Sequence, residues 1–162
     1  MSEFQFQLST IGVVHVGTDG FVLELEPAYR LALDGLEGFS HLNVLWWAHF
    51  VDEQDLRTIV ACDQPYQKAP PTLGIFATRS PVRPNPIAIS VAPVLQIDQE
   101  MGRIHVAYLD AEDGTPVLDI KPYLPSTDRV QVVSTPDWCQ HWPQWYEESG
   151  NFDWQAEFIH AR

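Results

Sequence analysis

The sequence contains few basic residues, since nine Lys and Arg stand against 22 Asp and Glu and leave its 162 residues with a net charge of −13. A protein that grips a polyanion through its phosphates needs the opposite balance. The acidic residues are spread along the chain, which is typical of a solvated surface rather than of an acidic tail. The composition therefore favours a small or neutral substrate over a nucleic acid.

Long hydrophobic runs, a signal peptide and metal-ligand spacings are also missing. The longest apolar run, residues 44–51, contains His49 and is too short to span a membrane. The N-terminal stretch MSEFQFQLST lacks the basic and apolar blocks of a signal peptide, so we expect a cytoplasmic protein. Cys62 and Cys139 are isolated, which favours reduced structural thiols. His41 and His49 would lie about 27 Å apart on one strand, so we expect no metal site there.

Short alternating apolar segments predict a mostly β barrel with short helices. One hairpin is expected around a GTDG turn and a second after the proline-rich loop, with a buried strand between them that is apolar on both faces. We expect a short helix after Pro27 that ends at Gly35 or Gly38. Residues 111–128 are expected to form an ordered, proline-rich loop. The expected strands cover residues 10–16, 21–26, 41–50, 73–78, 87–98 and 103–110, with a weak one near 58–61.

The C-terminal stretch differs in composition, because it carries four of the six tryptophans. Such dense aromatic residues bury large areas when they pack. We therefore divide the chain into a β-barrel domain, residues 1–133, and a Trp-rich extension, residues 134–162. The extension is expected to pack on the barrel or on a second subunit.

The sequence has no glycine-rich phosphate loop and no nucleophile elbow. Three segments nevertheless concentrate polar side chains at expected strand ends. These are His49 after the buried strand, the stiff loop TRSPVRPNPIAIS at residues 78–90, and residues 110–123. A rigid loop that holds charged side chains is a common way to build a binding site, although its prolines also protect a strand edge.

Each of these segments also has a purely structural interpretation. His49 is compatible with a core histidine that has its hydrogen bonds satisfied. Arg79 or Arg83 is able to pair with Asp113 or Asp119 and so pin one loop against another. Asp110 and Asp113 have the side chain that caps turns.

Three blocks, GLEGFSHLNVLWWAHF, GIFATRSPVRPNPIAISV and LDAEDGTPVLDIKPYLPSTD, resemble the signature blocks of the TsaA-like family, whose best-characterised members are TrmO-type tRNA methyltransferases. The resemblance implies a small single-sheet β-barrel that binds S-adenosylmethionine (SAM) near a homodimer interface. It also implies N6-methylation of threonylcarbamoyladenosine beside the anticodon, although the net charge disfavours tRNA. The alternatives are a non-catalytic SAM- or ligand-binding module and a methyltransferase that acts on a small molecule.

The resemblance also implies which residues form the site. SAM contacts fall on His49, Phe50, Arg79, Ile89, Asp110, Ala111, Glu112 and Asp113. Candidates for removing the acceptor's proton are His49, Asp113 and Tyr123, among which the sequence does not choose. Arg79 is expected to face the ligand and Arg83 to hold the loop. The chain departs from the family in having Ala88 where a glycine is usual. It also lacks the Pro-Arg-Gln segment that family members carry after the first strand.

Overall fold

The computed structural model describes residues 6–18 and 20–159, and the chain divides into two compact units. The barrel unit consists of Met1–Asp52 and Asn85–Arg129, and the aromatic unit consists of Glu53–Pro84 and Val130–Arg162. The sequence predicted a division after residue 133, whereas the contacts of the structure group the Trp-rich tail with Glu53–Pro84. Among the described residues, no helix has the length and apolar character that crossing a membrane requires.

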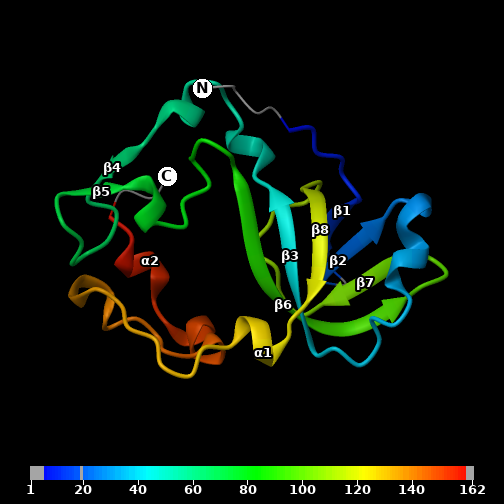
Figure 1. The fold of residues 1–162 in the computed structure, drawn as a ribbon. Helices are drawn as coiled ribbons and strands as arrows, with labels where there is room; N and C mark the ends of the chain where they lie inside the picture. Colours follow the sequence, from blue (N-terminus) through cyan, green and yellow to red (C-terminus); the bar gives the residue numbers. More distant parts are fainter. Residues whose placement is uncertain (1–5, 19, 160–162) are drawn as a thin grey trace. The chain divides into compact units, whose positions relative to one another are not determined.

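The barrel unit contains one antiparallel sheet that closes into a barrel, with its strands in the order β1–β2–β7–β6–β3–β8 (Figure 1). The strands are β1 (Gly12–Gly17), β2 (Gly20–Leu25), β3 (His41–Trp47), β6 (Ile87–Asp98), β7 (Arg103–Val106) and β8 (Pro116–Pro122). Short helical segments follow three of these strands: η1 (Pro27–Leu33) after β2, η2 (His49–Val51) after β3 and α1 (Pro125–Asp128) after β8. The predicted mostly β barrel with short helices is confirmed.

Alternate residues of these strands face the interior of the barrel, as a period of two requires. The core consists of aliphatic side chains that are almost entirely buried. They are Val14, Leu23, Leu25, Leu33, Leu42, Val44, Ala92, Ile104, Val106, Leu109 and Val117. Closure of the barrel gives each of its strands a hydrogen-bonded neighbour on both sides.

The first hairpin is tight, because β1 and β2 pair without interruption from Gly12 opposite Leu25 to Gly17 opposite Gly20. The turn between them includes Asp19, which lies outside the described residues. The space for a ligand-binding loop between the two strands is therefore absent from this hairpin. The second predicted hairpin is also confirmed, since β6 and β7 pair in antiparallel fashion.

Three sequence predictions in the barrel unit need correction. β3 ends at Trp47, so His49 lies on the following turn and does not share a strand face with His41. Residues 111–128 are not a loop throughout, because β8 pairs with both β1 and β3. β8 begins and ends with proline, and at strand ends a proline costs few ladder hydrogen bonds. The last strand of the second hairpin stops at Val106 rather than at residue 110.

The aromatic unit has a core of its own. Its elements are η3 (Leu56–Thr58), β4 (Ala61–Asp63), β5 (Thr72–Gly74), η4 (Ile75–Ala77), η5 (Asp137–Cys139), η6 (Tyr146–Asn151) and α2 (Trp154–Glu157). Only the first part of the predicted strand 73–78 is a strand, because η4 follows it. Buried Tyr66, Ala69 and Leu73 pack against Cys62, Trp138 and Trp142. Both cysteines are free.

Candidate functional site

The predicted SAM-contact residues of the barrel unit lie on segments that meet at one end of the barrel. Because neighbouring strands are antiparallel, β1, β3 and β7 finish at the same end at which β2, β6 and β8 begin. We call this end the distal end. His49 and Phe50 follow β3 there, Ile89 lies near the start of β6 opposite Leu45, and residues 110–113 precede β8. The predicted SAM contacts of this unit therefore lie on connections that meet at one end.

His49 is held in a short turn whose main chain is well anchored. The backbone N–H of Ala48 donates to the carbonyl of Pro86 (2.8 Å), and the indole N–H of Trp47 donates to the Asp52 carboxylate (2.8 Å). The ring centroids of His49 and Phe50 are 3.9 Å apart. The Nδ1 atom of His49 is buried, and no hydrogen-bond partner for it is found among the described residues. A histidine fixed in this way has one ring nitrogen available to a ligand or to a proton.

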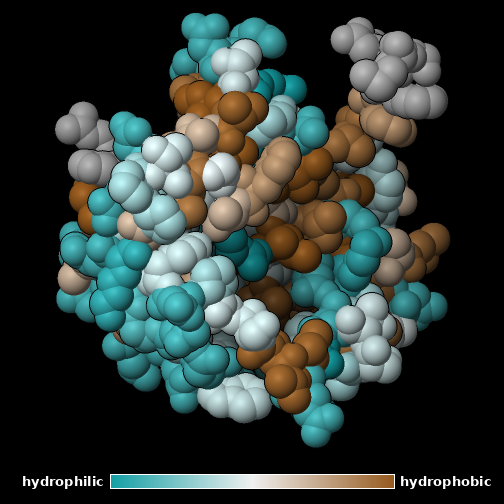
Figure 2. All heavy atoms as spheres, turned by 60° about the vertical axis from the view of Figure 1, so that its left-hand side comes forward, coloured by the Kyte–Doolittle hydropathy of each residue, from teal (hydrophilic) through white to brown (hydrophobic). Residues whose placement is uncertain are grey.

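Apolar surface accompanies this histidine. Phe50 is 67% exposed and Ile89 is 47% exposed. Figure 2 shows that apolar side chains, in brown, interrupt the largely polar surface of the molecule. Exposed apolar side chains beside a few polar groups are the usual lining of a small-molecule site.

The connection from β7 to β8 carries exposed carboxylates between two buried residues. Leu109 and Thr115 are each 1% exposed and fix the ends of this segment. Between them Asp110 and Glu112 are exposed, and neither side chain has a partner among the residues that the structure describes. Ala111 is half-buried and packs against the barrel core. Asp110 and Glu112 are thus available for hydroxyl or amino groups of a ligand.

Asp113 has a structural role. Its carboxylate accepts a hydrogen bond from the backbone N–H of Val16 (2.9 Å) and lies 3.9 Å from Nδ1 of His15. Backbone hydrogen bonds between Val14 and the segment 114–115 continue the same ladder. Asp113 therefore ties the β7–β8 connection to β1, which agrees with the turn-forming interpretation of this residue.

Tyr123 lies at the other end of the barrel. Its backbone N–H donates to the carbonyl of His41, the first residue of β3 (3.0 Å). The seven residues of β3 separate this end from His49 by about 20 Å. The structure does not bring Tyr123 together with the other candidate residues of the barrel unit.

Arg79 and Arg83 belong to the aromatic unit, in a loop stiffened by its own side chains. The Thr78 hydroxyl donates to the carbonyl of Ile75 (2.8 Å) and accepts from the backbone N–H of Ser80 (3.2 Å). Arg83 donates from Nη2 to the carbonyls of Thr78 (3.2 Å) and Ile75 (3.5 Å). The prediction that Arg83 holds the loop is confirmed. Arg79, which belongs to the same clamped loop, is exposed.

Some functional features gave no readable signal in the sequence. The pairing of Asp113 with Val16 depends on β8 being a strand, which its prolines concealed. Asp119, considered as a partner for an arginine, instead forms an ion pair with Lys121. The contacts of Tyr66 with the tail depend on the grouping of Glu53–Pro84 with the tail, which composition does not reveal.

Comparison with known proteins identifies the family. The model of the tRNA-methyltransferase O N-terminal domain matches residues 14–129. This chain belongs to that family. A protein of Methanothermobacter thermautotrophicus named "Probable S-adenosyl-L-methionine-binding protein" is 33% identical, over 80% of this chain and 98% of its own length. The predicted resemblance to the TsaA-like, TrmO-type family is confirmed.

Larger relatives match over part of their length. The tRNA (adenine(37)-N6)-methyltransferase of Escherichia coli is 42% identical over 64% of this chain and 44% of the enzyme. The crystal structure of TrmO from Pseudomonas aeruginosa superposes with a TM-score of 0.64 and 29% identity, covering 84% of this chain and 62% of that chain. This chain thus spans less than two thirds of both the E. coli enzyme and the P. aeruginosa TrmO chain.

Proposed function

We propose that this chain is a SAM-dependent methyltransferase that methylates N6 of adenosine 37 in tRNA, the position next to the anticodon. The observation that carries the proposal is the meeting of His49, Phe50, Ile89 and the Asp110–Asp113 connection at the distal end of a barrel of this family. Relatives named as SAM-binding proteins and as tRNA methyltransferases support it.

The residues present fit SAM chemically. Phe50 and Ile89 offer apolar surface for the adenine, and the unpartnered carboxylates of Asp110 and Glu112 suit ribose hydroxyls or the amino group. Ala111 lies between these two carboxylates in the sequence. We assign the carboxylate of SAM to Arg79, because a guanidinium binds a carboxylate through two parallel hydrogen bonds. The main role that we assign to Asp113 is to hold the β7–β8 connection against β1.

SAM, when bound, supplies an electrophilic methyl group on a sulfonium. The chain's own part is to orient the acceptor nitrogen in line with that methyl group and to take the proton that the nitrogen loses. We assign this proton to Nδ1 of His49, which is buried and lacks a hydrogen-bond partner among the described residues. The anchored backbone around His49 keeps its ring in place.

Isothermal titration with SAM tests the assignment. We expect saturable binding by the wild type and a loss of roughly ten- to a hundredfold in affinity for Arg79→Ala, because a charge-assisted hydrogen bond contributes about 1.5–3 kcal/mol. Lys68→Ala is the matched control, since it removes an exposed cation from the same unit and should bind as the wild type does. Absence of SAM binding by the wild type at high micromolar SAM concentration would contradict the proposal.

A second candidate is a methyltransferase for a small molecule, or a SAM-binding module without catalysis. The charge of the barrel unit favours it, because this unit has fourteen acidic and four basic residues. Two of those basic residues are already paired, Arg103 with Glu24 and Lys121 with Asp119. Binding to tRNA at several salt concentrations separates the candidates. A flat salt dependence together with no methyl transfer to tRNA would favour the second.

We also propose that the protein acts as a homodimer in the cytoplasm, where tRNA is modified. Support for self-association comes from the outer face of β6, on which Ile87 and Ile89 are 37% and 47% exposed beside Leu45 of β3. Sedimentation should show a dimer for the wild type and a monomer for Ile87→Glu. A wild-type monomer at micromolar concentration would contradict the proposal.

A further inference from the structure

One aromatic side chain of the aromatic unit differs from the packed rings around which that unit is built. Phe76, the middle residue of η4, is 81% exposed. Tyr66, by contrast, is buried, and its ring stacks on Trp138 with the centroids 5.6 Å apart. An exposed apolar ring gains little from packing within its own chain, so its surroundings decide which partner it suits.

The turn that carries Phe76 is fixed on both sides by buried residues. The backbone N–H of Ile75 donates to the carbonyl of Val60 (2.9 Å). The backbone N–H and the hydroxyl of Thr78 both donate to the carbonyl of Ile75 (3.1 and 2.8 Å). Arg83 donates from Nη2 to the carbonyls of Ile75 (3.5 Å) and Thr78 (3.2 Å). The exposed ring is therefore attached to a preorganised main chain, which lowers the cost of binding a partner.

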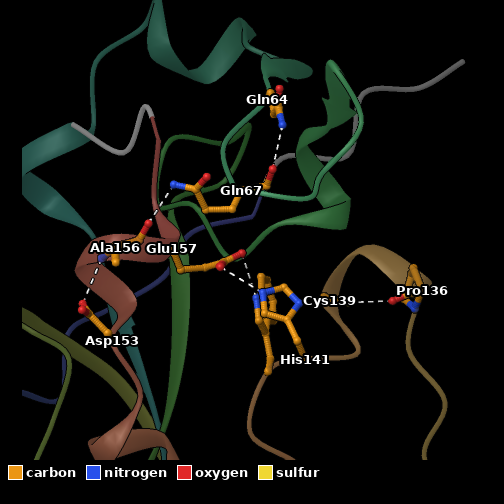
Figure 3. Close-up of polar contacts among 9 residues, drawn as sticks. Gln64, Gln67, Pro136, Cys139, His141, Asp153, Ala156 and Glu157 are labelled. Atoms are coloured by element: carbon orange, nitrogen blue, oxygen red, sulfur yellow. Dashed lines mark hydrogen bonds and ion pairs between the residues drawn. The ribbon is translucent and has the colours of Figure 1, made fainter.

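Hydrogen bonds also join the preceding residues to the Trp-rich tail (Figure 3). The backbone N–H of Gln67 donates to the carbonyl of Glu157 (3.1 Å), and its side-chain amide donates to the carbonyl of Ala156 (2.9 Å). The buried carboxylate of Glu157 accepts from Nε1 of Trp142 and from Nε2 of His141, each at 3.0 Å. The part of the chain that leads to Phe76 is thus anchored on a packed aromatic core.

The charge around Phe76 favours an anionic partner. Residues 64–84, which we call the acid-free segment, contain three basic residues, Lys68, Arg79 and Arg83, and no Asp or Glu. The guanidinium of Arg83 lies 3.5 Å from the carbonyl oxygen of the residue before Phe76. The barrel unit has the opposite balance, with fourteen acidic and four basic residues. Of these two parts of the chain, the acid-free segment is therefore the one that attracts an RNA backbone.

The other exposed aromatic side chains of this unit lie in acidic sequence. Trp145 is 64% exposed and lies two residues before Glu147, and the exposed Phe158 directly follows Glu157. Among the exposed aromatic residues that the structure describes in this unit, only Phe76 belongs to the acid-free segment. Aromatic rings beside cations bind single-stranded nucleic acids, because the bases stack on the rings while the cations offset the phosphates.

We propose that Phe76 is a stacking platform for an unpaired base of the RNA acceptor, and that the fixed guanidinium of Arg83 beside it offsets the charge of the adjoining phosphate. This inference rests on the proposed function, in which tRNA is the acceptor. The site consists of residues of the aromatic unit alone. Phe76 contributes affinity for RNA and takes no part in methyl transfer itself.

Anisotropy of a fluorescein-labelled tRNA anticodon stem-loop, titrated with the protein in the absence of SAM, tests the inference. Phe76→Ala should weaken binding about five- to 150-fold, the range for the loss of one base–aromatic stack. Phe76→Trp should bind at least as tightly as the wild type, whereas Phe76→Leu, which keeps apolar area but no ring, should bind weakly. Trp145→Ala is the matched control, because it removes an exposed ring from acidic sequence and should leave RNA affinity unchanged.

Three readouts distinguish a lost stack from a disturbed turn. The dependence of RNA affinity on salt concentration should have the same slope in Phe76→Ala and in the wild type, because no charge is removed. The SAM affinity of Phe76→Ala in isothermal titration should equal that of the wild type, since Arg79 of the same loop is retained. In methyl transfer, Phe76→Ala should raise the KM for RNA and leave the rate at saturating RNA unchanged.

Equal RNA affinity of the wild type and Phe76→Ala would overturn the inference, as would a wild type that binds no RNA. Tight binding by Phe76→Leu would assign an apolar contact in place of a stack. Loss of self-association in Phe76→Ala with unchanged RNA affinity would assign the ring to a protein contact. Both results overturn the inference.

The same experiments separate this inference from the proposed function. A wild type that binds RNA through Phe76 but transfers no methyl group to tRNA contradicts the proposed function and leaves the stacking platform in place. Methyl transfer to tRNA with an unchanged KM for RNA in Phe76→Ala contradicts the stacking platform and leaves the proposed function in place.

Discussion

Replacement of Glu157 should reveal how much the tail depends on one buried carboxylate. The side chain accepts from Trp142 and His141 in a site almost closed to water. Glu157→Ala leaves the Trp142 indole N–H without an acceptor, and each buried donor in that position costs about 1–3 kcal/mol. Water replaces part of the contact to His141, whose side chain is 27% exposed. We therefore expect Glu157→Ala to lower the free energy of unfolding by about 3 kcal/mol.

Glu157→Gln should cost less, because the amide keeps an oxygen for the Trp142 indole while the charge opposite His141 is lost. We expect about 1–2 kcal/mol. Urea unfolding followed by tryptophan fluorescence measures both, since four of the six tryptophans belong to the tail. Gln155→Ala, an exposed position of the same short helix, is the control and should stay within about 0.5 kcal/mol of the wild type. Equal stability of Glu157→Ala and the control would refute the reasoning.

The pH dependence of stability gives a second view of this site. Burial raises the pKa of Glu157, but the hydrogen bonds from His141 and Trp142 outweigh it and hold the pKa below its ordinary value of 4.5. A lowered pKa in the folded state means that the carboxylate stabilises the fold above pH 4.5 and that this contribution is lost as the pH falls further. The wild type should therefore lose more stability than Glu157→Gln does on acidification below pH 4.5. Parallel pH profiles for the two proteins would contradict this.

Two further substitutions test backbone features. Gly12→Ala should destabilise the barrel by about 3 kcal/mol or more in thermal unfolding, because its Cβ would lie 2.3 Å from the carbonyl oxygen of Glu24. Gly17→Ala in the same strand, where a Cβ meets nothing within 4 Å, is the control and should be nearly neutral. Arg83→Ala should cost about 1–2 kcal/mol and should speed proteolysis of the Thr78–Arg83 loop, because two carbonyls lose their donor. Unchanged proteolysis would show that the prolines alone hold that loop.

Much of the barrel was predictable from its apolar patterns. Both hairpins follow from apolar residues at every second position between glycine turns, and β3 follows from a run that is apolar on both faces. β8 was missed because Pro116 and Pro122 look like loop residues, yet they stand at the two ends of the strand, where a missing donor does little harm. The end of β3 at Trp47 was missed for a different reason. The apolar composition continues to Val51, and composition does not mark the point at which the chain turns.

The site was predictable to the extent that strand order decides it. Antiparallel neighbours bring the segments after β3 and before β8 to the same end of a barrel, so the proximity of His49 and Asp110 follows from topology. Tyr123 was grouped with them because the sequence places it only ten residues after Asp113. A strand of seven residues, β8, begins and ends within that interval and carries Tyr123 to the opposite end. Sequence distance is a poor guide wherever a strand intervenes.

Charge and chemistry together suggest how one acidic barrel serves two ligands of different sign. SAM carries a sulfonium, an ammonium and one carboxylate, so it is cationic at neutral pH, and a unit with fourteen acidic and four basic residues attracts it. The same field repels the phosphates of tRNA. The exposed carboxylates of Asp110 and Glu112 thus favour the binding of SAM and disfavour the binding of the proposed tRNA acceptor. Affinity for the proposed tRNA acceptor must therefore come largely from contacts to bases, such as the base at position 37, because the exposed Arg79 is already assigned to the cofactor.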